Sequence, residues 1–335
     1  MGESIAVLGF DDLPHSDFSC SGLSSAYNTV DRDEAKRVLR QAIQLGVTIW
    51  DTAPIYGQGD NEKLIGEVLA EEQDRARVFL ITKWGVRTTS GFEADGSAEY
   101  CHKSIEESID RLGFTPDAYL LHRIDKNTPI EESARAMDEV RKAGKTKYIG
   151  LSEASQVFCR LYCSAETLQR ASQVAKIDFI QIEYSPWTLD FEQNGVLALA
   201  RKLGTIVLAY SPLGRGFLTG KVKPSDLEKT DWRNSYPRAQ QDVLEHNMKI
   251  VAELEKIAKE KGCETSQLVL AWLMAQGDNI VPIPGTTSAK RLEENFASRE
   301  VSLSPDDDKR IRKVIEENRP KGTRYNEAGM RTLDA

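Results

Sequence analysis

The 335-residue chain lacks several features that would assign it to whole classes of protein. No apolar run approaches the roughly 20 residues needed to cross a bilayer, and the N-terminus lacks the basic-then-apolar pattern of a signal peptide. An excess of basic residues is also missing, because the formal net charge is −8. A nucleic-acid partner is therefore not expected, since phosphate binding needs a basic surface. We expect a cytoplasmic protein with no membrane interaction.

Cysteine is scarce, and its spacing matches no metal or redox motif. The five cysteines include no C-x-x-C pair, and Cys159 and Cys163 stand four residues apart. An odd, scattered set in such a chain indicates reduced, packed thiols rather than disulfides or a zinc site. No metal site is expected. A G-x-G-x-x-G motif after a strand is absent as well, so a Rossmann-type dinucleotide site has no support.

What the chain does have is a regular alternation of strand and helix patterns. Apolar runs predict strands at 47–51, 78–83, 118–122, 148–152, 179–184, 205–210 and 280–284, with a weaker candidate at 18–23. Helical spacing predicts helices at 33–45, 64–69, 104–112, 130–143, 165–174, 196–203, 243–261 and 265–276. Gly46, Gly113, Gly144 and Gly204 close four of these helices.

Alternating strands and helices predict parallel βαβ units. The strands are continuously apolar, as in sheets that are buried on both faces. Eight such units favour a single-domain (β/α)₈ TIM barrel over a doubly wound sheet. We assign the barrel to residues 1–318. Residues 319–335 lose periodicity and are expected to form a C-terminal loop or tail.

The segment V-T-I-W-D-T-A-P-I-Y-G at 47–57 is the most informative part of the chain. It predicts a buried strand that ends on Asp51 and a tight turn that presents Tyr56. Pro54 fixes φ within the turn, and Gly57 permits a positive φ at its exit. An ionisable residue at a strand exit lies where an α/β barrel keeps its chemistry.

Polar side chains recur at the carboxyl ends of other predicted strands, so a barrel would gather them on one rim. The set is Asp51, Lys83, His122, Ser152, Gln181 and Tyr210. Tyr56 can protonate a carbonyl oxygen if its pKa, normally about 10, is lowered by the Lys83 cation. Asp51 can hold Lys83 and keep it charged, and His122 can orient the substrate oxygen. None of these groups can supply hydride, so a cofactor must.

Two segments are candidates for binding the phosphates of such a cofactor. G-R-G-F-L-T-G-K at 214–221 misses the P-loop spacing, but its amides and Arg215 can cradle a pyrophosphate. The last strand leads into G-T-T-S-A-K-R at 285–291, which opens a helix. Amides at a helix N-terminus together with Lys290 or Arg291 would suit a 2′-phosphate.

Taken together, the residues resemble the aldo-keto reductases, over about 300 residues. The family's Asp, Tyr, Lys and His tetrad matches Asp51 and Tyr56 in D-T-A-P-I-Y-G, Lys83 in I-T-K-W and His122 in L-L-H-R. The resemblance implies that Tyr56 is the general acid, tuned by Lys83 and Asp51. It also implies NADPH or NADP⁺ as cofactor and a small aldehyde or ketone as substrate, in a monomer or weak homo-oligomer.

The resemblance carries over a set of cofactor contacts along the rim. They are Ser152, Glu153, Gln181, Tyr210, Ser211, Leu213, Gly214, Arg215, Gly285, Thr287, Arg291, Glu294 and Asn295. Ser152, Glu153 and Gln181 match the nicotinamide-carboxamide contacts, and Tyr210 matches the residue that stacks on the ring. Arg291 matches the arginine at the 2′-phosphate, and Glu294 and Asn295 match the adenine contacts.

The chain departs from the family pattern at three places. Glu153 stands where many members have Asn, as is tolerated in the plant and fungal branches that this chain resembles. Gly285 stands where better-known members have a Lys on the 2′-phosphate, which weakens the preference for NADPH over NADH. Residues 5–23 are irregular beside the usual glycine-rich first strand.

Large aromatics near the strand exits are candidates for the substrate pocket. They are Trp84, Tyr184, Trp187 and Trp232. Packing between strands and helices is an equally ordinary role for each of them. Two other functions stay open: an NADP(H)-binding regulatory subunit, similar to potassium-channel β-subunits, and a lyase or aldolase that forms a Schiff base at Lys83. Pairing with Asp51 would keep Lys83 charged and poorly nucleophilic, which counts against the Schiff base.

Overall fold

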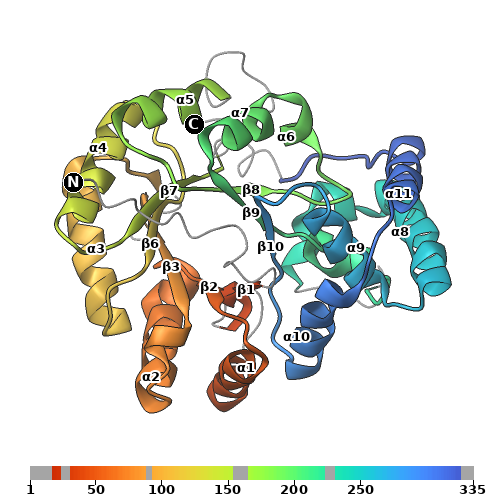
Figure 1. Cartoon of the computed structure of the whole chain (residues 1–335), viewed down its shortest axis with the longest axis horizontal. Helices are drawn as coiled ribbons and strands as arrows, with labels where there is room; N and C mark the ends of the chain where they lie inside the picture. Colours follow the sequence, from red (N-terminus) through yellow and green to blue (C-terminus); the bar gives the residue numbers. More distant parts are fainter. Residues whose placement is uncertain (1–16, 24–30, 88–92, 154–164, 223–230, 326–335) are drawn as a thin grey trace.

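Eight parallel strands form the centre of the computed structural model, which describes residues 17–23, 31–87, 93–153, 165–222 and 231–325 (Figure 1). In spatial order they are β1 (Asp17–Ser19), β2 (Ile49–Asp51), β3 (Phe79–Trp84), β6 (Ala118–Leu121), β7 (Tyr148–Ser152), β8 (Phe179–Glu183), β9 (Ile206–Tyr210) and β10 (Ile280–Ile283). A parallel bridge between Ser19 and Gly285 closes β1 against the end of β10. The predicted (β/α)₈ barrel is confirmed.

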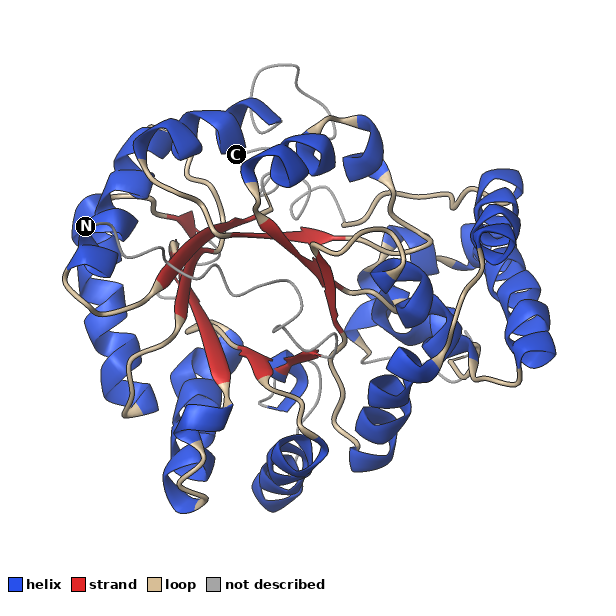
Figure 2. Cartoon of the chain, in the orientation of Figure 1, coloured by secondary structure: helices blue, strands red, loops and turns tan. Residues whose placement is uncertain are grey.

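Helices surround the strands on the outside (Figure 2). They are α1 (Arg32–Leu45), α2 (Asp60–Glu71), α3 (Ala98–Leu112), α4 (Ile130–Lys142), α5 (Ala165–Val174), α6 (Asp190–Gln193), α7 (Val196–Leu203), α8 (Gln241–Lys261), α9 (Thr265–Met274), α10 (Ala289–Phe296) and α11 (Pro305–Glu317). A short antiparallel pair, β4 (Val86–Arg87) with β5 (Glu93–Ala94), follows β3. None of the helices in the described ranges is long and apolar enough to cross a membrane.

Most predicted elements are confirmed, with errors at their ends. Helices α2 and α3 begin earlier than predicted, at Asp60 and Ala98, because their first turns are polar and fall outside the apolar periodicity. Ser97 caps α3 by accepting a hydrogen bond from the Tyr100 amide. The predicted strand at 18–23 is only partly right. Strand β1 ends at Ser19, and a 3₁₀ helix (Cys20–Leu23) follows it.

The core has two layers that the alternation of side chains along each strand keeps apart. An inner cluster fills the barrel and includes Ile49, Ile81, Leu120, Phe179 and Leu208. Outer clusters pack the strands against the helices. On β3, Ile81 belongs to the inner cluster and Leu80 to an outer one, so Lys83, two residues after Ile81, also faces the interior.

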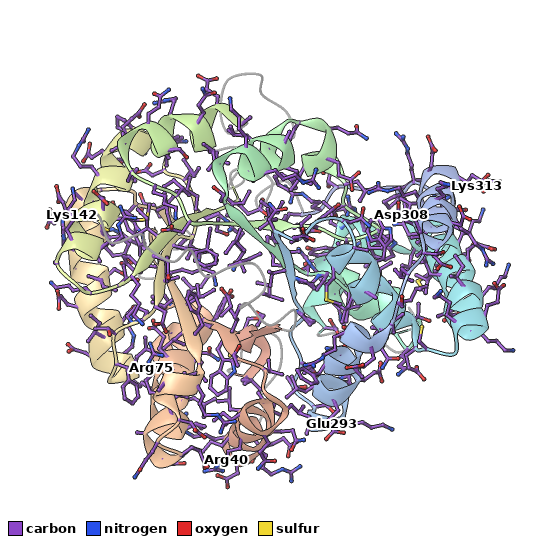
Figure 3. The ribbon with its side chains drawn as sticks, in the orientation of Figure 1. Arg40, Arg75, Lys142, Glu293, Asp308 and Lys313 are labelled. Carbon is purple, nitrogen blue, oxygen red and sulfur yellow. The ribbon has the colours of Figure 1, made fainter. Side chains whose placement is uncertain are left out.

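The outer faces of the helices carry the charged residues. Arg40, Lys142, Glu293 and Lys313 lie at the periphery and point away from the strands (Figure 3). Arg40 pairs with Glu71 at 2.6 Å, which links α1 to α2. Exposed pairs of this kind contribute only about 0–1 kcal/mol each. These surface pairs therefore contribute little to the stability of the fold.

The chain after α11 packs onto the barrel. Asn247 and Lys321 exchange two hydrogen bonds, of 2.7 and 3.0 Å, and Arg238 Nε donates to the Gly322 carbonyl at 3.1 Å. Arg324 is only 2 % exposed. Residues 319–325 form neither helix nor strand, and these contacts pack them against the barrel, while residues 326–335 of the predicted tail lie outside the described residues. We call residues 319–325 the C-terminal segment.

Candidate active site

Asp51 and Lys83 form a buried ion pair at the ends of β2 and β3. Lys83 Nζ lies 2.6 Å from Asp51 Oδ2 and 2.9 Å from the Thr52 carbonyl oxygen. Both side chains are almost completely buried, with 0 % and 1 % of their surface exposed. Gln181 Nε2 donates to the other carboxylate oxygen of Asp51 at 2.7 Å. The carboxylate is therefore held from both sides, and it fixes the ammonium group in turn.

Tyr56 lies in the turn after β2, and its hydroxyl group approaches the ammonium group of Lys83. The turn has the predicted positive φ at Gly57, +58°, and a second one at Gln58, +53°. Lys83 Nζ lies 3.5 Å from the Tyr56 hydroxyl oxygen. The His122 ring packs edge-on against Tyr56, with 6.1 Å between ring centroids. The structure thus brings together all four residues of the predicted tetrad.

Burial changes the proton affinities of two of these groups. Burial lowers the pKa of the Lys83 ammonium, while the charge and hydrogen bond of Asp51 oppose that lowering. The pKa of His122 lies well below its usual range, first because the ring is buried and then because Arg123 and Lys83 are cationic neighbours. His122 is therefore a neutral imidazole near pH 7, able to donate a hydrogen bond from one ring nitrogen.

This depressed pKa predicts a loss of stability in acid. Unfolded His122 takes up a proton below about pH 6.5, whereas the folded residue does not, so the free energy of unfolding falls as pH decreases. The wild-type protein should lose up to about 1.4 kcal/mol per pH unit below 6.5 relative to His122→Asn. Urea unfolding of both proteins at pH 7.5 and 5.5 measures the difference. Equal losses in the two proteins would contradict a neutral, buried His122.

The other predicted carboxamide contacts lie at the ends of the next two strands. Ser152 and Gln181 are opposite each other on β7 and β8, and both are buried. Glu153 follows Ser152 with a positive φ of +52°, unusual for a residue with a side chain. Its carboxylate accepts a hydrogen bond from the Glu183 amide at 3.2 Å. The structure therefore directs Glu153 toward the interior of the rim.

A cluster of buried charges that the sequence did not reveal surrounds Glu153. Glu183 is 4 % exposed and lies 3.6 Å from Arg215, 3.9 Å from Arg238 and 3.9 Å from Arg324. Glu183 was predictable in part, because it stands two residues after Gln181 and so shares its inward face. Arg238 and Arg324 lie in segments without periodicity, and no local pattern marks them.

The Arg215 side chain points into the protein rather than toward the solvent, where it could bind a phosphate. Its guanidinium carbon lies 3.3 Å from the centroid of the Tyr236 ring and 4.6 Å from that of Tyr325. Together with the ion pair to Glu183, these contacts turn the side chain inward. The prediction that the Arg215 side chain cradles a pyrophosphate therefore finds no support in this conformation.

The backbone amides of the loop after β9 are better placed to bind an anion than the Arg215 side chain is. Ser211, Gly214, Arg215 and Gly216 all have positive φ values, from +50° to +96°. Successive amides in such conformations form concave anion-binding sites. Leu213 is buried, and Trp187 packs beneath the loop against Phe217, with 5.7 Å between ring centroids. This support holds the loop at the rim, beside Tyr210.

The predicted 2′-phosphate and adenine contacts lie in the segment after β10. Arg291 is exposed at the start of α10, and its guanidinium donates to the Thr286 and Thr287 hydroxyls at 3.2 Å each. Glu294 pairs with Lys221, which follows the β9 loop, at 2.7 Å, while Asn295 is buried. A side chain in place of Gly285 would crowd the closure of the barrel, because its Cβ would lie 3.3 Å from the Ser19 carbonyl oxygen.

Two of the predicted substrate-pocket aromatics belong to the core instead. Trp84 follows the inward Lys83, so it faces outward, and it stacks on Tyr119 at 6.0 Å between centroids. Tyr184 also faces outward, where its hydroxyl meets Glu192 and its ring packs 6.3 Å from Trp272. Assigning Trp84 and Tyr184 to the pocket was therefore wrong. Trp187 supports the β9 loop, and the Trp232 side chain is outside the described part of the structure.

Comparison with known proteins agrees with this geometry. The model of the aldo/keto reductase family matches residues 20–316. The chain belongs to the aldo/keto reductase family. It is 41 % identical to an aldo-keto reductase of Gibberella moniliformis, over 96 % of both chains.

Two further relatives are similar over most of their length. The aldo-keto reductase yakc [NADP(+)] of Schizosaccharomyces pombe is 39 % identical, over 95 % of this chain and 93 % of the relative. A glycerol dehydrogenase from Gluconobacter oxydans superposes with a TM-score of 0.81 and 26 % identity, over 92 % of this aldo/keto reductase and 93 % of that chain. The family match over residues 20–316 includes all four residues of the predicted tetrad.

Proposed function

We propose that this aldo/keto reductase is an NADPH-dependent enzyme that reduces an aldehyde or ketone to an alcohol. The observation that carries the proposal is the continuous chain of contacts from Asp51 through Lys83 to the Tyr56 hydroxyl, with neutral His122 beside it. When bound, the cofactor supplies the hydride that no side chain of the tetrad can supply.

Each tetrad residue has a distinct part in the proton transfer. Tyr56 donates its hydroxyl proton to the carbonyl oxygen. Lys83 stabilises the phenolate left behind, because its ammonium group lies 3.5 Å from the hydroxyl oxygen. Asp51 holds that ammonium group in place. His122 hydrogen-bonds to the substrate oxygen and fixes it near Tyr56.

The rest of the rim has the donor groups that a dinucleotide phosphate needs. Ser152, Glu153 and Gln181 offer polar groups for the carboxamide, beside the ring of Tyr210. The positive-φ loop after β9 offers amides for the pyrophosphate. Arg291 is an exposed cation between two threonine hydroxyls, which suits a 2′-phosphate. The NADP(+) in the name of the fission-yeast relative is in line with this choice.

The geometry favours neither of the two other functions. Lys83 is completely buried and bound to Asp51 Oδ2 and the Thr52 carbonyl, so its nitrogen is not available as a Schiff-base nucleophile. A regulatory subunit with little turnover would not need the tetrad to be assembled, yet all four side chains are in place.

The test is a turnover assay with activated aromatic aldehydes and ketones, followed by the loss of NADPH absorbance. We expect reduction with NADPH and weaker reduction with NADH. Arg291→Ala should weaken NADPH binding about tenfold to a hundredfold, because a charged hydrogen bond contributes roughly 1.5–3 kcal/mol, and should leave NADH binding unchanged. Arg37→Ala, which removes an exposed arginine on α1, is the matched control. Unchanged NADPH affinity in Arg291→Ala would remove the 2′-phosphate assignment.

A further inference from the structure

The buried ion pair between Glu153 and Arg324 joins the end of β7 to the C-terminal segment. Arg324 Nη2 lies 3.3 Å from Glu153 Oε2, and Arg324 Nη1 lies 3.4 Å from Glu153 Oε1. The geometry is that of a two-pronged pair between a guanidinium and a carboxylate. Each residue is only 2 % exposed. Removing either partner of such a buried pair leaves an uncompensated charge, which is strongly destabilising.

The C-terminal segment is anchored in a way that delivers Arg324 to this position. Asn247, near the start of α8, binds both the amide and the carbonyl of Lys321. Arg238 Nε donates to the Gly322 carbonyl. The next side chain along the segment, Tyr325, places its hydroxyl 3.0 Å from that of Tyr210. Two consecutive residues of the segment therefore contact two residues predicted to meet the nicotinamide.

Charge explains why Glu153 needs this partner. Burial alone would raise the pKa of Glu153, but the cations Arg324 and Arg123 outweigh burial and hold it below its usual range. A neutral Asn at this position would need no counter-ion. The substitution of Glu for Asn and the buried Arg324 thus belong together, although 171 positions separate them in the chain.

We propose that Arg324 is a positioning residue for the nicotinamide end of the cofactor, acting as the counter-ion that fixes the Glu153 carboxylate to receive the carboxamide NH₂. This inference rests on the proposed NADPH-dependent function. It makes Arg324, near the end of the C-terminal segment, a support of the cofactor site, because Glu153 is correctly charged and oriented only when Arg324 is seated on the barrel.

The experiment measures NADPH binding to the cofactor-free protein by fluorescence titration in a double-mutant cycle. Arg324→Met should weaken NADPH binding by about tenfold or more, because it removes the cation that hydrogen-bonds to both oxygens of the buried Glu153 carboxylate. Glu153→Gln combined with Arg324→Met should restore binding to within about threefold of wild type, since the pair is then neutral. Arg319→Met, an exposed arginine in the same segment, is the control and should bind NADPH normally.

A second readout follows the segment itself. Hydrogen exchange of residues 319–325 should slow when NADPH binds the wild-type protein, because the cofactor and the segment stabilise the same Glu153 conformation. In Arg324→Met this slowing should be lost. A purely structural role for Arg324 would lower the melting temperature without changing the NADPH dissociation constant or the response to the cofactor.

Each outcome separates this inference from the proposed function. If wild type binds NADPH and Arg324→Met binds it equally well, Arg324 is not a positioning residue, while the reductase proposal stands. If wild type does not bind NADPH, both fail. A loss in Arg324→Met that Glu153→Gln does not relieve would overturn the coupling. Should Arg324→Met fail to fold, recovery of both fold and binding in the double variant supports the coupling, and failure of both refutes it.

Discussion

Replacing Tyr56 with phenylalanine is expected to lower kcat for carbonyl reduction by about 10²–10⁴-fold, the usual contribution of a positioned general acid. The variant loses only the hydroxyl group, whose oxygen lies 3.5 Å from Lys83 Nζ. The affinity for NADPH should not change, because the proposed cofactor contacts lie on other strand ends. Single-turnover oxidation of NADPH and a fluorescence titration measure the two quantities.

Tyr148→Phe is the matched control for this variant. Tyr148 begins β7, whereas Ser152 ends it, so the Tyr148 hydroxyl lies toward the opposite end of the barrel. Its removal should leave kcat unaffected. Equal rates for Tyr56→Phe and wild type would show that the proton comes from another donor.

Lys83→Met should cost both stability and activity. The change leaves the Asp51 carboxyl group without its partner in a site where it is 1 % exposed, and breaking a buried pair in this way costs about 3–5 kcal/mol. Activity should fall at least as far as in Tyr56→Phe, since the phenolate would lose its neighbouring cation. Urea unfolding and the rate of NADPH oxidation measure the two effects.

The double variant Asp51→Asn, Lys83→Met separates the two effects. Removing both charges should restore much of the stability, because no buried charge is left without a partner. Activity should stay low, because the cation near Tyr56 is still missing. If the double variant regained activity together with stability, Lys83 would have only a structural role.

The tetrad was predictable because barrel topology turns sequence positions into spatial ones. Residues at the carboxyl ends of parallel strands converge on one rim, so Asp51, Lys83 and His122 could be placed together without coordinates. Tyr56 needed only the local turn chemistry of Pro54 and Gly57. The sequence thus predicted the convergence that the structure shows, while the catalytic roles stay predictions.

The aromatic residues show how the direction of a side chain decides its surroundings. Alternation along a strand puts Lys83 and Trp84 on opposite faces, and likewise Glu183 and Tyr184. This alternation places Trp84 and Tyr184 in the outer core, and it places Glu183 on the inner face with Lys83. The direction of a side chain therefore predicts whether it lines the pocket better than its distance from a strand end does.

By itself the sequence determined the eight parallel strands, the rim on which the tetrad gathers and the family to which the chain is similar. These follow from strand periodicity, turn residues and the order of motifs, which are all local. Only the tertiary structure decided the partners of Glu153, the inward turn of Arg215 and the seating of residues 319–325. These depend on ion pairs between segments far apart in the chain, and an aperiodic segment carries no local pattern that says where it will pack.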